Sequence, residues 1–363
     1  MSFSAIDHQF MAGALREARK GLWTTDPNPA VGCVIAQHDE QVGAGFTQAP
    51  GQPHAEIMAL RAAGDRARGA TVYTTLEPCS HFGRTPPCVD ALIEAGVARV
   101  VSAMADPNPL VDGQGHDRLA DAGIQVEQGL MEAQARALNP GFISRFERKR
   151  PWVRAKIAGS VDGRSSGPDG QSQWITSRAA RQDGHRWRAQ ASAILTGIGT
   201  VMADNPALDV RLDEFSRRLP VVVVDSHARL PADRKILQGK DARVIQATTG
   251  TPADKHATDV LELSAGPDGR VPLADLMHRL LEFDINTLHV EAGPTLTGAL
   301  LMDGLVDELI VYQAASLMGE RGQALVCLPG MEKFSQRLHL EPLDQRRVGS
   351  DLRWIYRLKP TAA

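Results

Sequence analysis

The sequence lacks several features that mark membrane and secreted proteins. Its 363 residues include only four cysteines, and no stretch approaches the ~20 apolar residues that a membrane span needs. Residues 1–10 carry neither the basic nor the apolar segment of a signal peptide, so we expect a cytoplasmic protein that does not bind a membrane. In that reducing compartment, four cysteines are expected to be thiols or metal ligands and not a disulfide framework.

An excess of positive charge is also missing. The chain has 40 Lys and Arg residues against 43 Asp and Glu residues, a formal net charge of -3. It therefore offers no broad positive field for a polyanion, and nucleic acid is not an expected partner. A composition of 43% hydrophobic and 23% charged residues is that of an ordinary soluble globular protein.

The length of the chain exceeds what one hydrophobic core usually organises, so we expect two domains. We place the boundary within residues 139–152, where Pro140, Gly141, Pro151 and a cluster of charged side chains interrupt helical and strand periodicity. This cluster is interpreted as a solvated linker, the alternative being a basic patch for nucleic acid or membrane. The predicted domains are residues 1–147 and 148–363.

Apolar periodicity predicts alternating strands and helices in both halves, with no internal repeat between them. The first half is expected to form helices over residues 7–20, with Asp7 as N-cap, 55–63 and 89–95, and strands over residues 31–36, 41–46, 70–75 and 99–104. The second half is expected to form strands over residues 153–157, 193–196, 221–225, 243–246, 287–291 and 308–313. Both halves are therefore predicted to be α/β, with at least part of the first sheet parallel.

A possible zinc site stands out in the first half. His54-Ala55-Glu56 opens a predicted helix, and Cys79 and Cys88 follow. One imidazole and two thiolates are suitable zinc ligands, and three protein ligands leave the fourth tetrahedral position open for water, as catalysis requires. Such a water is a nucleophile near neutral pH, and Glu56 is the candidate to carry its proton to a leaving nitrogen.

Two points limit this interpretation. Residues two apart on a regular helix point away from each other, so His54 and Glu56 must both reach the metal from the first turn. The alternative is a capped helix with buried thiols. Of the other cysteines, Cys33 lies in an apolar strand and is predicted to be a core thiol, and Cys327 has no ligand-like neighbours.

These motifs resemble the cytidine-deaminase superfamily, whose usual second motif is a shorter Pro-Cys-x-x-Cys. Longer motifs, in matching order across nearly the whole chain, resemble the bifunctional deaminase–reductase family of riboflavin biosynthesis, often called RibD. They are TLEPCSHFGRTPPC at residues 75–88, PNPAVG at 27–32, DPNP at 106–109, KIAGSVDG at 156–163, SQWITS at 172–177 and EAGPTL at 291–296. The resemblance implies a cytidine-deaminase-like α/β/α domain followed by a dihydrofolate-reductase-like α/β domain.

The resemblance also implies the first reaction. Zinc held by the first domain would serve to deaminate 2,5-diamino-6-(5-phosphoribosylamino)pyrimidin-4-one at the ring carbon that bears the 2-amino group, giving 5-amino-6-(5-phosphoribosylamino)uracil. Asn28 is expected at the pyrimidine edge, and His81 and Arg84 at the phosphate. A helix-flanking turn is the alternative for Asn28, and a solvated loop charge for Arg84. Asp106 and Asn108 match a family loop near this pocket.

The second half has only the beginning of a dinucleotide fingerprint, at Gly197-Ile198-Gly199, and this is weak evidence. Its predicted strand over residues 287–291 runs into Gly293 and a helix that continues to Leu300 or beyond. Glycine permits close approach of the backbone, and free amides at a helix N-terminus bind a diphosphate. From the residues alone, a phosphate site and an ordinary strand–helix turn both stay open; the resemblance implies NADPH binding and reduction of the ribosyl to a ribityl side chain.

Matching motifs carry the family's reductase contacts onto this chain. The implied NADPH contacts are Ala158, Trp174, Thr200, Asp204, Ser226, Gly293, Pro294, Thr295, Leu296, Thr297, Gly298 and Ala299. The implied substrate contacts are Ser172, Arg188, Leu208, Arg211 and Glu291, with the two arginines as phosphate clamps. Ordinary packing is the alternative for Trp174 and Leu208. Asp225, next to Ser226, leaves the choice of NADPH over NADH open.

Reduction of an opened or imine-like sugar also needs a proton source. Lys156, expected at the end of the strand over residues 153–157, and Glu291 are the ionisable candidates. An ordinary strand-end ion pair is the alternative for Lys156, and Asp162 is expected to shape a turn.

Two other functions compete with this one. A nucleoside or RNA-base deaminase with a binding module is opposed by the long loop between the cysteines, the negative net charge and the apparently complete reductase half. A zinc-stabilised structural protein would normally close its metal site with four protein ligands, and the sequence offers three. We expect small-molecule pyrimidine ribose-phosphate substrates and a homo-oligomer; the size of that oligomer, channelling between sites, the relative rates and the hydride face stay open.

Overall fold

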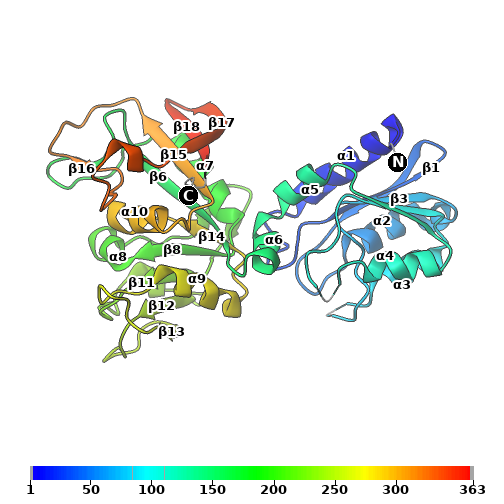
Figure 1. Cartoon of the computed structure of the whole chain (residues 1–363), viewed down its shortest axis with the longest axis horizontal. Coiled ribbons are helices and arrows are strands. Elements are labelled where there is room, and N and C mark those ends of the chain that lie inside the picture. The colour runs from blue at the N-terminus through cyan, green and yellow to red at the C-terminus, as the bar shows by residue number, and fades with distance from the viewer. Residues whose placement is uncertain (1–2, 84, 110, 360–363) are drawn as a thin grey trace. The chain divides into compact units, whose positions relative to one another are not determined.

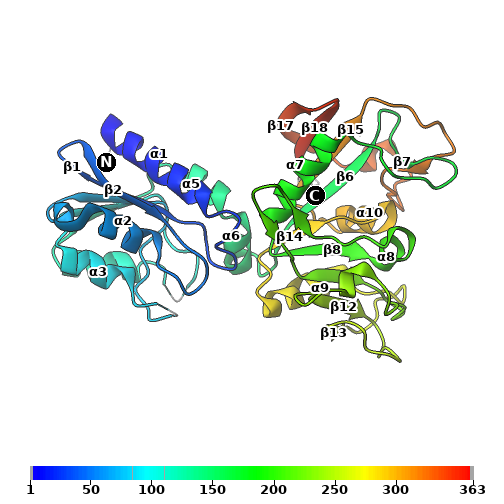
Figure 2. The same cartoon turned by 180° about the vertical axis from the view of Figure 1, so that it is seen from behind.

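The computed structural model describes residues 3–83, 85–109 and 111–359. The chain divides into two compact units, Met1–Lys149 and Arg150–Ala363, and both are built from strands and helices (Figures 1 and 2). Among the described residues, no helix is both long enough and apolar enough to cross a membrane.

The first unit is a three-layer α/β/α structure. Its strands form a sheet in the order β2-β1-β3-β4-β5, antiparallel from β2 to β3 and parallel from β3 to β5. Helices α1 and α5 lie on one face, and α2, α3 and α4 on the other (Figures 1 and 2). The elements are α1 (Ala5–Lys20), β1 (Gly32–Gln37), β2 (Glu40–Phe46), α2 (Ala55–Ala63), β3 (Thr71–Thr74), α3 (Cys88–Ala95), β4 (Arg99–Ser102), α4 (Gln114–Asp121), β5 (Gln125–Gln128), α5 (Glu132–Leu138) and α6 (Pro140–Glu147).

Small residues bring the helices close to the first two strands. A Cβ on Gly32 would lie 1.9 Å from the carbonyl oxygen of Ala14 in α1, and one on Gly45 would lie 2.7 Å from the amide nitrogen of Ala59 in α2. Cys33 pairs with Gly45 across the antiparallel ladder, so both point to the same face of the sheet. Cys33 therefore faces α2 and is fully buried there, as predicted for a core thiol.

The prediction of Asp7 as N-cap of the first helix is wrong. The cap is Ser4, and Asp7 is the third helical residue of a capping box. The Asp7 carboxylate also accepts hydrogen bonds from Tyr73 Oη at 2.8 Å and Arg99 Nη1 at 2.7 Å. Arg99 also forms an ion pair with Glu127, with Nη2 3.0 Å from Oε2. This network therefore connects α1 with β3, β4 and β5.

The prediction of a solvated linker over residues 139–152 is also wrong in part. Residues 140–147 form α6, with Pro140 in its first turn, where the missing amide hydrogen costs nothing. Asn139 accepts a hydrogen bond from the amide of Ala30 at 2.7 Å and donates one to its carbonyl at 3.0 Å. The segment up to Glu147 is therefore a packed helix of the first unit.

The second unit is built on a longer sheet, in the order β13-β12-β11-β8-β14-β6-β15-β18-β17. Strands β13 to β15 of this order are parallel, and β18 and β17 are antiparallel to their neighbours. The elements are β6 (Trp152–Ser160), β7 (Arg164–Ser166), α7 (Arg178–Ala189), β8 (Ala193–Gly197), α8 (Ile198–Asp204), β9 (Val210–Arg211), β10 (Ser216–Arg217), β11 (Val221–Val224), β12 (Val244–Thr248), β13 (Asp259–Glu262), α9 (Leu273–Leu280), β14 (Thr287–Val290), α10 (Pro294–Met302), β15 (Glu308–Ala314), β16 (Gln323–Ala324), β17 (Leu340–Val348) and β18 (Asp351–Leu358).

The two faces of the second sheet have different chemistry. Val153, Ala155 and Ile157 of β6 join an apolar core that includes residues of α9 and α10. The alternate residues face α7, where the Arg154 guanidinium lies 4.6 Å from the centre of the Trp187 ring. Charged side chains thus gather on the α7 face.

The register of the parallel strands corrects the position of Lys156. Strand β6 runs to Ser160, so Lys156 lies in its middle and not at its end. The neighbouring strand β14 ends at Val290, which pairs with Ala155. Glu291, the next residue, is therefore level with Lys156.

Our first prediction tests the Asp7 network. Asp7→Asn should lower the free energy of unfolding of the first unit by about 2 kcal/mol, because the partly buried Arg99 loses one of its two charged partners and the hydrogen bonds to the buried Asp7 weaken. Urea unfolding at pH 7 measures this. Lys20→Gln is the matched control, since it removes an ion pair with Glu17 on the same helix whose lysine is exposed, and it should change stability by less than about 0.5 kcal/mol.

The same variant has a predicted pH dependence. Burial raises the pKa of Asp7, but hydrogen bonds from Arg99, Ser4 and Tyr73 outweigh it and hold the pKa well below its usual range. The stabilisation is therefore present above the unfolded pKa of about 4 and is lost as the pH falls further. A stability difference between wild type and Asp7→Asn that stays constant from pH 7 to pH 2 would contradict this account.

Candidate active sites

Three soft ligands converge in the first unit. His54 caps α2, Cys79 lies on the loop after β3, and Cys88 is the first residue of α3. The Nδ1 atom of His54 lies 3.5 Å from Cys79 Sγ and 3.3 Å from Cys88 Sγ, and the three ligand atoms lie within 4.8 Å of one another. Nitrogen and sulfur ligands on one tetrahedral zinc lie about 3.6 Å apart, so this donor set fits the ion.

The backbone of His54 explains how a His-x-Glu spacing can serve one site. His54 has extended backbone angles, φ −76° and ψ 168°, and stands outside the helix, whereas Glu56 is the second helical residue. The Nε2 atom of His54 lies 3.3 Å from Thr85 Oγ1. A proton on Nε2 directed at Thr85 leaves the Nδ1 lone pair free for a metal.

The surroundings shift the pKa values of the site in useful directions. The Cys88 thiol and then His54 lower the pKa of Cys79 to about 4 despite burial, so one ligand is ready as thiolate. Burial, and next the negative charge of Cys79, raise the pKa of Glu56, which is 3% exposed. Its carboxylate receives hydrogen bonds from Cys88 and from its own backbone, and Thr74 Oγ1 lies 3.4 Å away. A buried carboxyl group with a raised pKa is suited to taking up and returning a proton near neutral pH.

Glu77 supports this site, although the sequence analysis gave it no role. Its side chain is fully buried and accepts hydrogen bonds from four backbone amides, those of Asp106 at 3.1 Å, Gly113 at 3.1 Å, Gly115 at 2.9 Å and His116 at 3.4 Å. This cradle joins the loop after β4 and the start of α4 to the residue two before Cys79.

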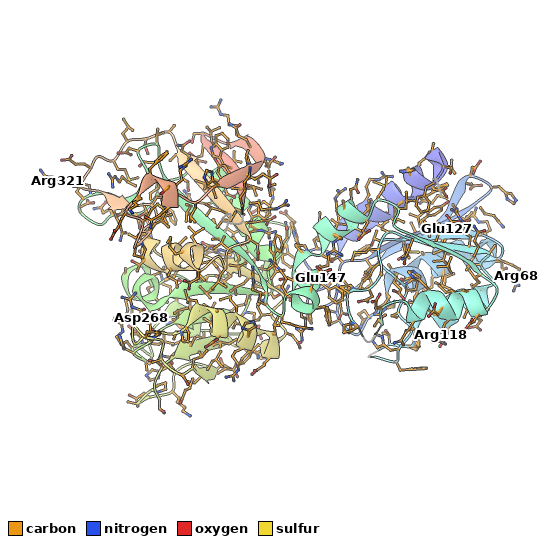
Figure 3. The ribbon with its side chains drawn as sticks, in the orientation of Figure 1. Arg68, Arg118, Glu127, Glu147, Asp268 and Arg321 are labelled. Atoms are coloured by element: carbon orange, nitrogen blue, oxygen red, sulfur yellow. The ribbon has the colours of Figure 1, made fainter. Side chains whose placement is uncertain are left out.

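A second tether holds the loop between the two cysteines. Arg118, labelled on α4 in Figure 3, donates a hydrogen bond to the carbonyl oxygen of Ser80 at 2.8 Å and pairs with Asp90 of α3. Arg118 of α4 therefore holds the loop that carries Cys79 in place.

The remaining residues predicted for the first site lie on loops. Asn28 donates its backbone N–H to Thr25 at 2.9 Å in the turn between α1 and β1, and His81 is exposed on the cysteine loop. Arg84 lies outside the described residues. Burial raises the pKa of Asp106 to about 6, and the charge of Glu77 adds to this shift. A hydrogen bond from the amide of Asn108 opposes it.

In the second unit, Glu291 is the centre of a charged cluster. Arg188 of α7 binds its carboxylate with two nitrogens, one of them Nη2 at 2.9 Å, and Lys156 Nζ lies 4.0 Å away. His289 Nε2 lies 3.3 Å from the other carboxylate oxygen, and this histidine is fully buried. Burial opposes ionisation of Glu291, but Arg188 chiefly holds its pKa well below the usual range.

Lys156 differs from an ordinary surface ion pair. Burial lowers the pKa of its ammonium group, the Glu291 charge opposes this shift, and the Arg188 charge adds to it. The Nζ atom also lies 5.9 Å from the centre of the Tyr312 ring, whose hydroxyl donates to Asp183 of α7 at 2.7 Å. A partly desolvated ammonium group of this kind can give up a proton more readily than a solvated one.

The structure brings four of the five predicted substrate residues to this cluster. Arg188 also donates to the carbonyl oxygen of Asp209 at 2.8 Å, and the amide of Arg211 donates to His185 Nδ1 at 3.2 Å. Leu208 is buried at φ 50° in the same segment. Burial, then the charges of Arg188 and Arg211, lower the pKa of His185 to about 4, so this histidine is neutral. The sequence predicts no role for His185 or His289, because His185 of α7 meets the Arg211 segment only in the folded unit and the burial of His289 depends on the folded sheet.

Ser172 and Trp174 lie in a different segment, residues 167–177. The Trp174 ring is 68% exposed and the Arg181 guanidinium lies 4.2 Å from its centre. Trp174 borders an open hollow of about 310 Å³, together with Thr176, Ser316 and Asp351. The structure therefore presents Trp174 at the surface, where a ligand can reach it, and not within the core.

Apart from Trp174, the predicted cofactor residues lie near the carboxyl ends of β6, β8, β11 and β14 or on the helices that follow them. Gly293 caps α10 after β14 without a side-chain hydrogen bond, and a Cβ built on it would lie 3.7 Å from Thr200 Oγ1 on α8. Ala158 lies on β6, Asp204 ends α8, and Ser226 follows β11. Gly298 is turned toward the carbonyl oxygen of Cys327, 1.6 Å from its would-be Cβ. An uncapped helix N-terminus without a Cβ at this edge fits the diphosphate of NADPH.

Comparison with known proteins connects both units to known families. Residues 4–104 match the cytidine and deoxycytidylate deaminase zinc-binding region, and residues 151–353 match the RibD C-terminal domain. The chain is 48% identical over 358 residues to the riboflavin biosynthesis protein RibD of Escherichia coli strain K12, a match that covers 95% of this chain and 98% of that protein.

Solved structures agree over the same length. RibD of Acinetobacter baumannii, form 1, is similar with a TM-score of 0.90 at 42% identity, covering 98% of this chain and 99% of that chain. The diaminohydroxyphosphoribosylaminopyrimidine deaminase/5-amino-6-(5-phosphoribosylamino)uracil reductase of Thermotoga maritima is similar with a TM-score of 0.87 at 32% identity, with the same coverage.

Our second prediction concerns zinc. The purified protein should contain one zinc ion per chain, and Cys88→Ala should bind zinc more than about a hundredfold more weakly, since losing a ligand costs more than losing an outer partner. Thr85→Val, which removes the partner of His54 Nε2, should weaken binding about tenfold. Zinc content after dialysis against a graded chelator measures both effects.

The controls separate ligands from neighbours. Glu56→Gln and Cys33→Ala should retain full zinc content, because neither side chain belongs to the ligand set. Full zinc content in Cys88→Ala, or loss of zinc from Cys33→Ala, would show that the ligands have been wrongly assigned.

Proposed function

Since this chain belongs to the RibD family of bifunctional riboflavin-biosynthesis deaminase–reductases, we propose that it deaminates 2,5-diamino-6-(5-phosphoribosylamino)pyrimidin-4-one and then reduces the product. The single observation that carries the proposal is the meeting of His54, Cys79 and Cys88 within 4.8 Å, in a chain that matches the family over almost its whole length. The resemblance noted in the sequence is thereby confirmed.

For the first reaction, His54, Cys79 and Cys88 would hold zinc, which supplies an activated water when bound. Glu56 takes a proton from the attacking water and delivers it to the leaving nitrogen. One C–N bond breaks, one C–O bond forms, and ammonia leaves. The raised pKa of Glu56 favours both halves of this transfer, because the group can hold and release a proton at neutral pH.

For the second reaction, the amides at the start of α10 would bind the diphosphate of NADPH, which supplies a hydride when bound. Arg188 and Arg211 would bind the substrate phosphate, although all three guanidinium nitrogens of Arg188 already have partners, two on Glu291 and one on the carbonyl oxygen of Asp209. Lys156 would give a proton to the opened sugar as C1 accepts hydride. Glu291 would hold the Lys156 ammonium group in position through their ion pair, and Arg188 and His289 contact the same carboxylate.

We also propose that each reaction belongs to one domain, residues 1–147 and residues 148–363, and that the protein forms a homo-oligomer in the cytoplasm. The chemistries share no proposed catalytic residue, and four cysteines that form no disulfide suit a reducing compartment. Sedimentation at micromolar concentration tests the homo-oligomer.

Our third prediction is the outcome of a two-step assay. With the diaminopyrimidine phosphate alone, the protein should release one ammonia per substrate, and NADPH should be oxidised only after deamination. Glu56→Gln should release no ammonia, yet should reduce the chemically prepared uracil intermediate at the wild-type rate. Release of ammonia from cytidine or from an RNA base in place of this substrate would overturn the proposal.

Our fourth prediction concerns the proton source. Lys156→Met keeps the length of the side chain and removes its charge. It should bind NADPH and deaminate normally but reduce the intermediate at least about a hundredfold more slowly, as expected for the loss of a general acid. A reduction rate within a fewfold of wild type would mean that Lys156 is structural.

A further inference from the structure

The turn that follows β11 contains residues that could distinguish NADPH from NADH, two nucleotides that differ by one phosphate on the adenosine ribose. We propose that Arg229 binds the 2′-phosphate of NADPH and that the buried carboxylate of Asp225 builds the turn that presents it. This inference rests on the proposed NADPH-dependent reduction and adds a specificity residue to it.

The place is set by the sheet. Ser226 follows β11, and β11 is separated from β14 by the single strand β8. Neighbouring strands lie about 4.8 Å apart, so the end of β11 is about 10 Å from Gly293. This separation suits a dinucleotide whose diphosphate lies at the start of α10 and whose adenosine ribose lies at the end of β11.

An acidic residue at the end of such a strand commonly binds the ribose hydroxyls of NADH and repels a 2′-phosphate. Asp225 holds that position in the sequence, but its side chain is fully buried. Its Oδ2 accepts hydrogen bonds from the amides of Arg229 at 2.6 Å and Leu230 at 2.9 Å, and from Gln246 Nε2 at 2.9 Å. Its Oδ1 has no hydrogen-bond partner but is buried as well, so neither oxygen of Asp225 is available to a ribose.

The same hydrogen bonds fold residues 225–230 around the carboxylate. The amide of Ala228 donates to the Asp225 carbonyl oxygen at 3.0 Å, and Ala228 has a φ of 51°, which turns the chain back at this point. Within this turn, the Arg229 guanidinium has Nε 3.6 Å from Asp225 Oδ1, and its side chain is 59% exposed. One edge of the guanidinium faces the buried carboxylate, and the other nitrogens are left for a ligand.

Ser226 supplies a matching donor. Its Oγ accepts a hydrogen bond from the amide of Val271 at 3.1 Å, so the hydroxyl oxygen is fixed and its hydrogen can be donated outward. Its carbonyl oxygen is occupied by Thr249 Oγ1 at 2.8 Å. A hydroxyl donor and a partly exposed guanidinium in one short turn form a suitable pair for a phosphate monoester, because arginine binds phosphate through paired charge-assisted hydrogen bonds.

The test compares binding of two nucleotides without turnover. Titration of the full chain with NADPH and with NADH, followed by nucleotide fluorescence, gives both dissociation constants. Arg229→Gln should weaken NADPH binding by about 10- to 100-fold, the loss expected for hydrogen bonds to a charged group. It should leave the dissociation constant for NADH within about twofold of wild type, since that nucleotide has no 2′-phosphate.

Controls make the result specific. Arg279→Gln, an exposed arginine of α9 in an ion pair with Glu282, removes the same charge from the same unit and should change neither constant. The isolated fragments 2′,5′-ADP and 5′-ADP should repeat the difference between NADPH and NADH. Loss of affinity for both nucleotides in Arg229→Gln, or for neither, would overturn the inference, whereas a wild-type protein that binds neither nucleotide would overturn the proposed reductase function itself.

Discussion

Burying a carboxylate costs free energy unless hydrogen-bond donors or cations replace its contacts with water. Buried carboxylates with such partners organise both units. Glu77 and Asp225 receive backbone amides, whereas Asp7 and Glu291 receive arginines. In each case the donors come from segments that the carboxylate joins together, so satisfying its charge also fixes the local fold. Glu56 is the contrasting case, because burial and the nearby charge of Cys79 outweigh the hydrogen bonds and the His54 charge that favour its ionised form. A raised pKa follows from that imbalance, and so does the capacity to move a proton.

Helix α7 gives the second unit its charged face. It carries Asp183, Trp187 and Arg188 toward the same side of the sheet, where they meet Tyr312, Arg154 and Glu291 respectively. Lys156 lies between Tyr312 and Glu291, with Nζ 5.9 Å from the centre of the Tyr312 ring and 4.0 Å from the Glu291 carboxylate. The opposite face of the same strand, with Ala155 and Ile157, belongs to the apolar core. Because side chains alternate along β6, its charged residues lie on one face of the sheet and its apolar core residues on the other.

The sequence predicted those features whose signal is local. Soft ligands at His54, Cys79 and Cys88, and a glycine before a helix at Gly293, are recognisable without knowing the fold, and the α/β class of both units followed from periodicity. Glu77 could not be assigned a role, because its partners lie 29 to 39 residues away and are backbone groups. His185 and His289 could not be assigned a role either, because the contact of His185 with Arg211 and the full burial of His289 exist only in the folded unit.

The errors have equally specific causes. Pro140 predicts a break in periodicity, but the first turn of a helix tolerates proline. The apolar pattern predicts a strand that ends near Lys156, but the strand continues past Ile157 through small residues. Asp225 left the cofactor choice open since the sequence does not reveal whether a carboxylate is buried.

The cradle around Glu77 also bears on how this family can change over time. Its four hydrogen-bond donors are main-chain amides, which every amino acid except proline provides, and the His116 side chain adds a longer contact, with Nδ1 3.9 Å from the carboxylate. Glycine is favoured at two of the four positions, because a Cβ on Gly115 would lie 2.2 Å from the carbonyl oxygen of Pro78 and Gly113 has a φ of 78°. A glutamate held in this way can stay fixed while the loop that holds it drifts in sequence, and it would leave no trace of paired substitutions by which covariation could detect the contact.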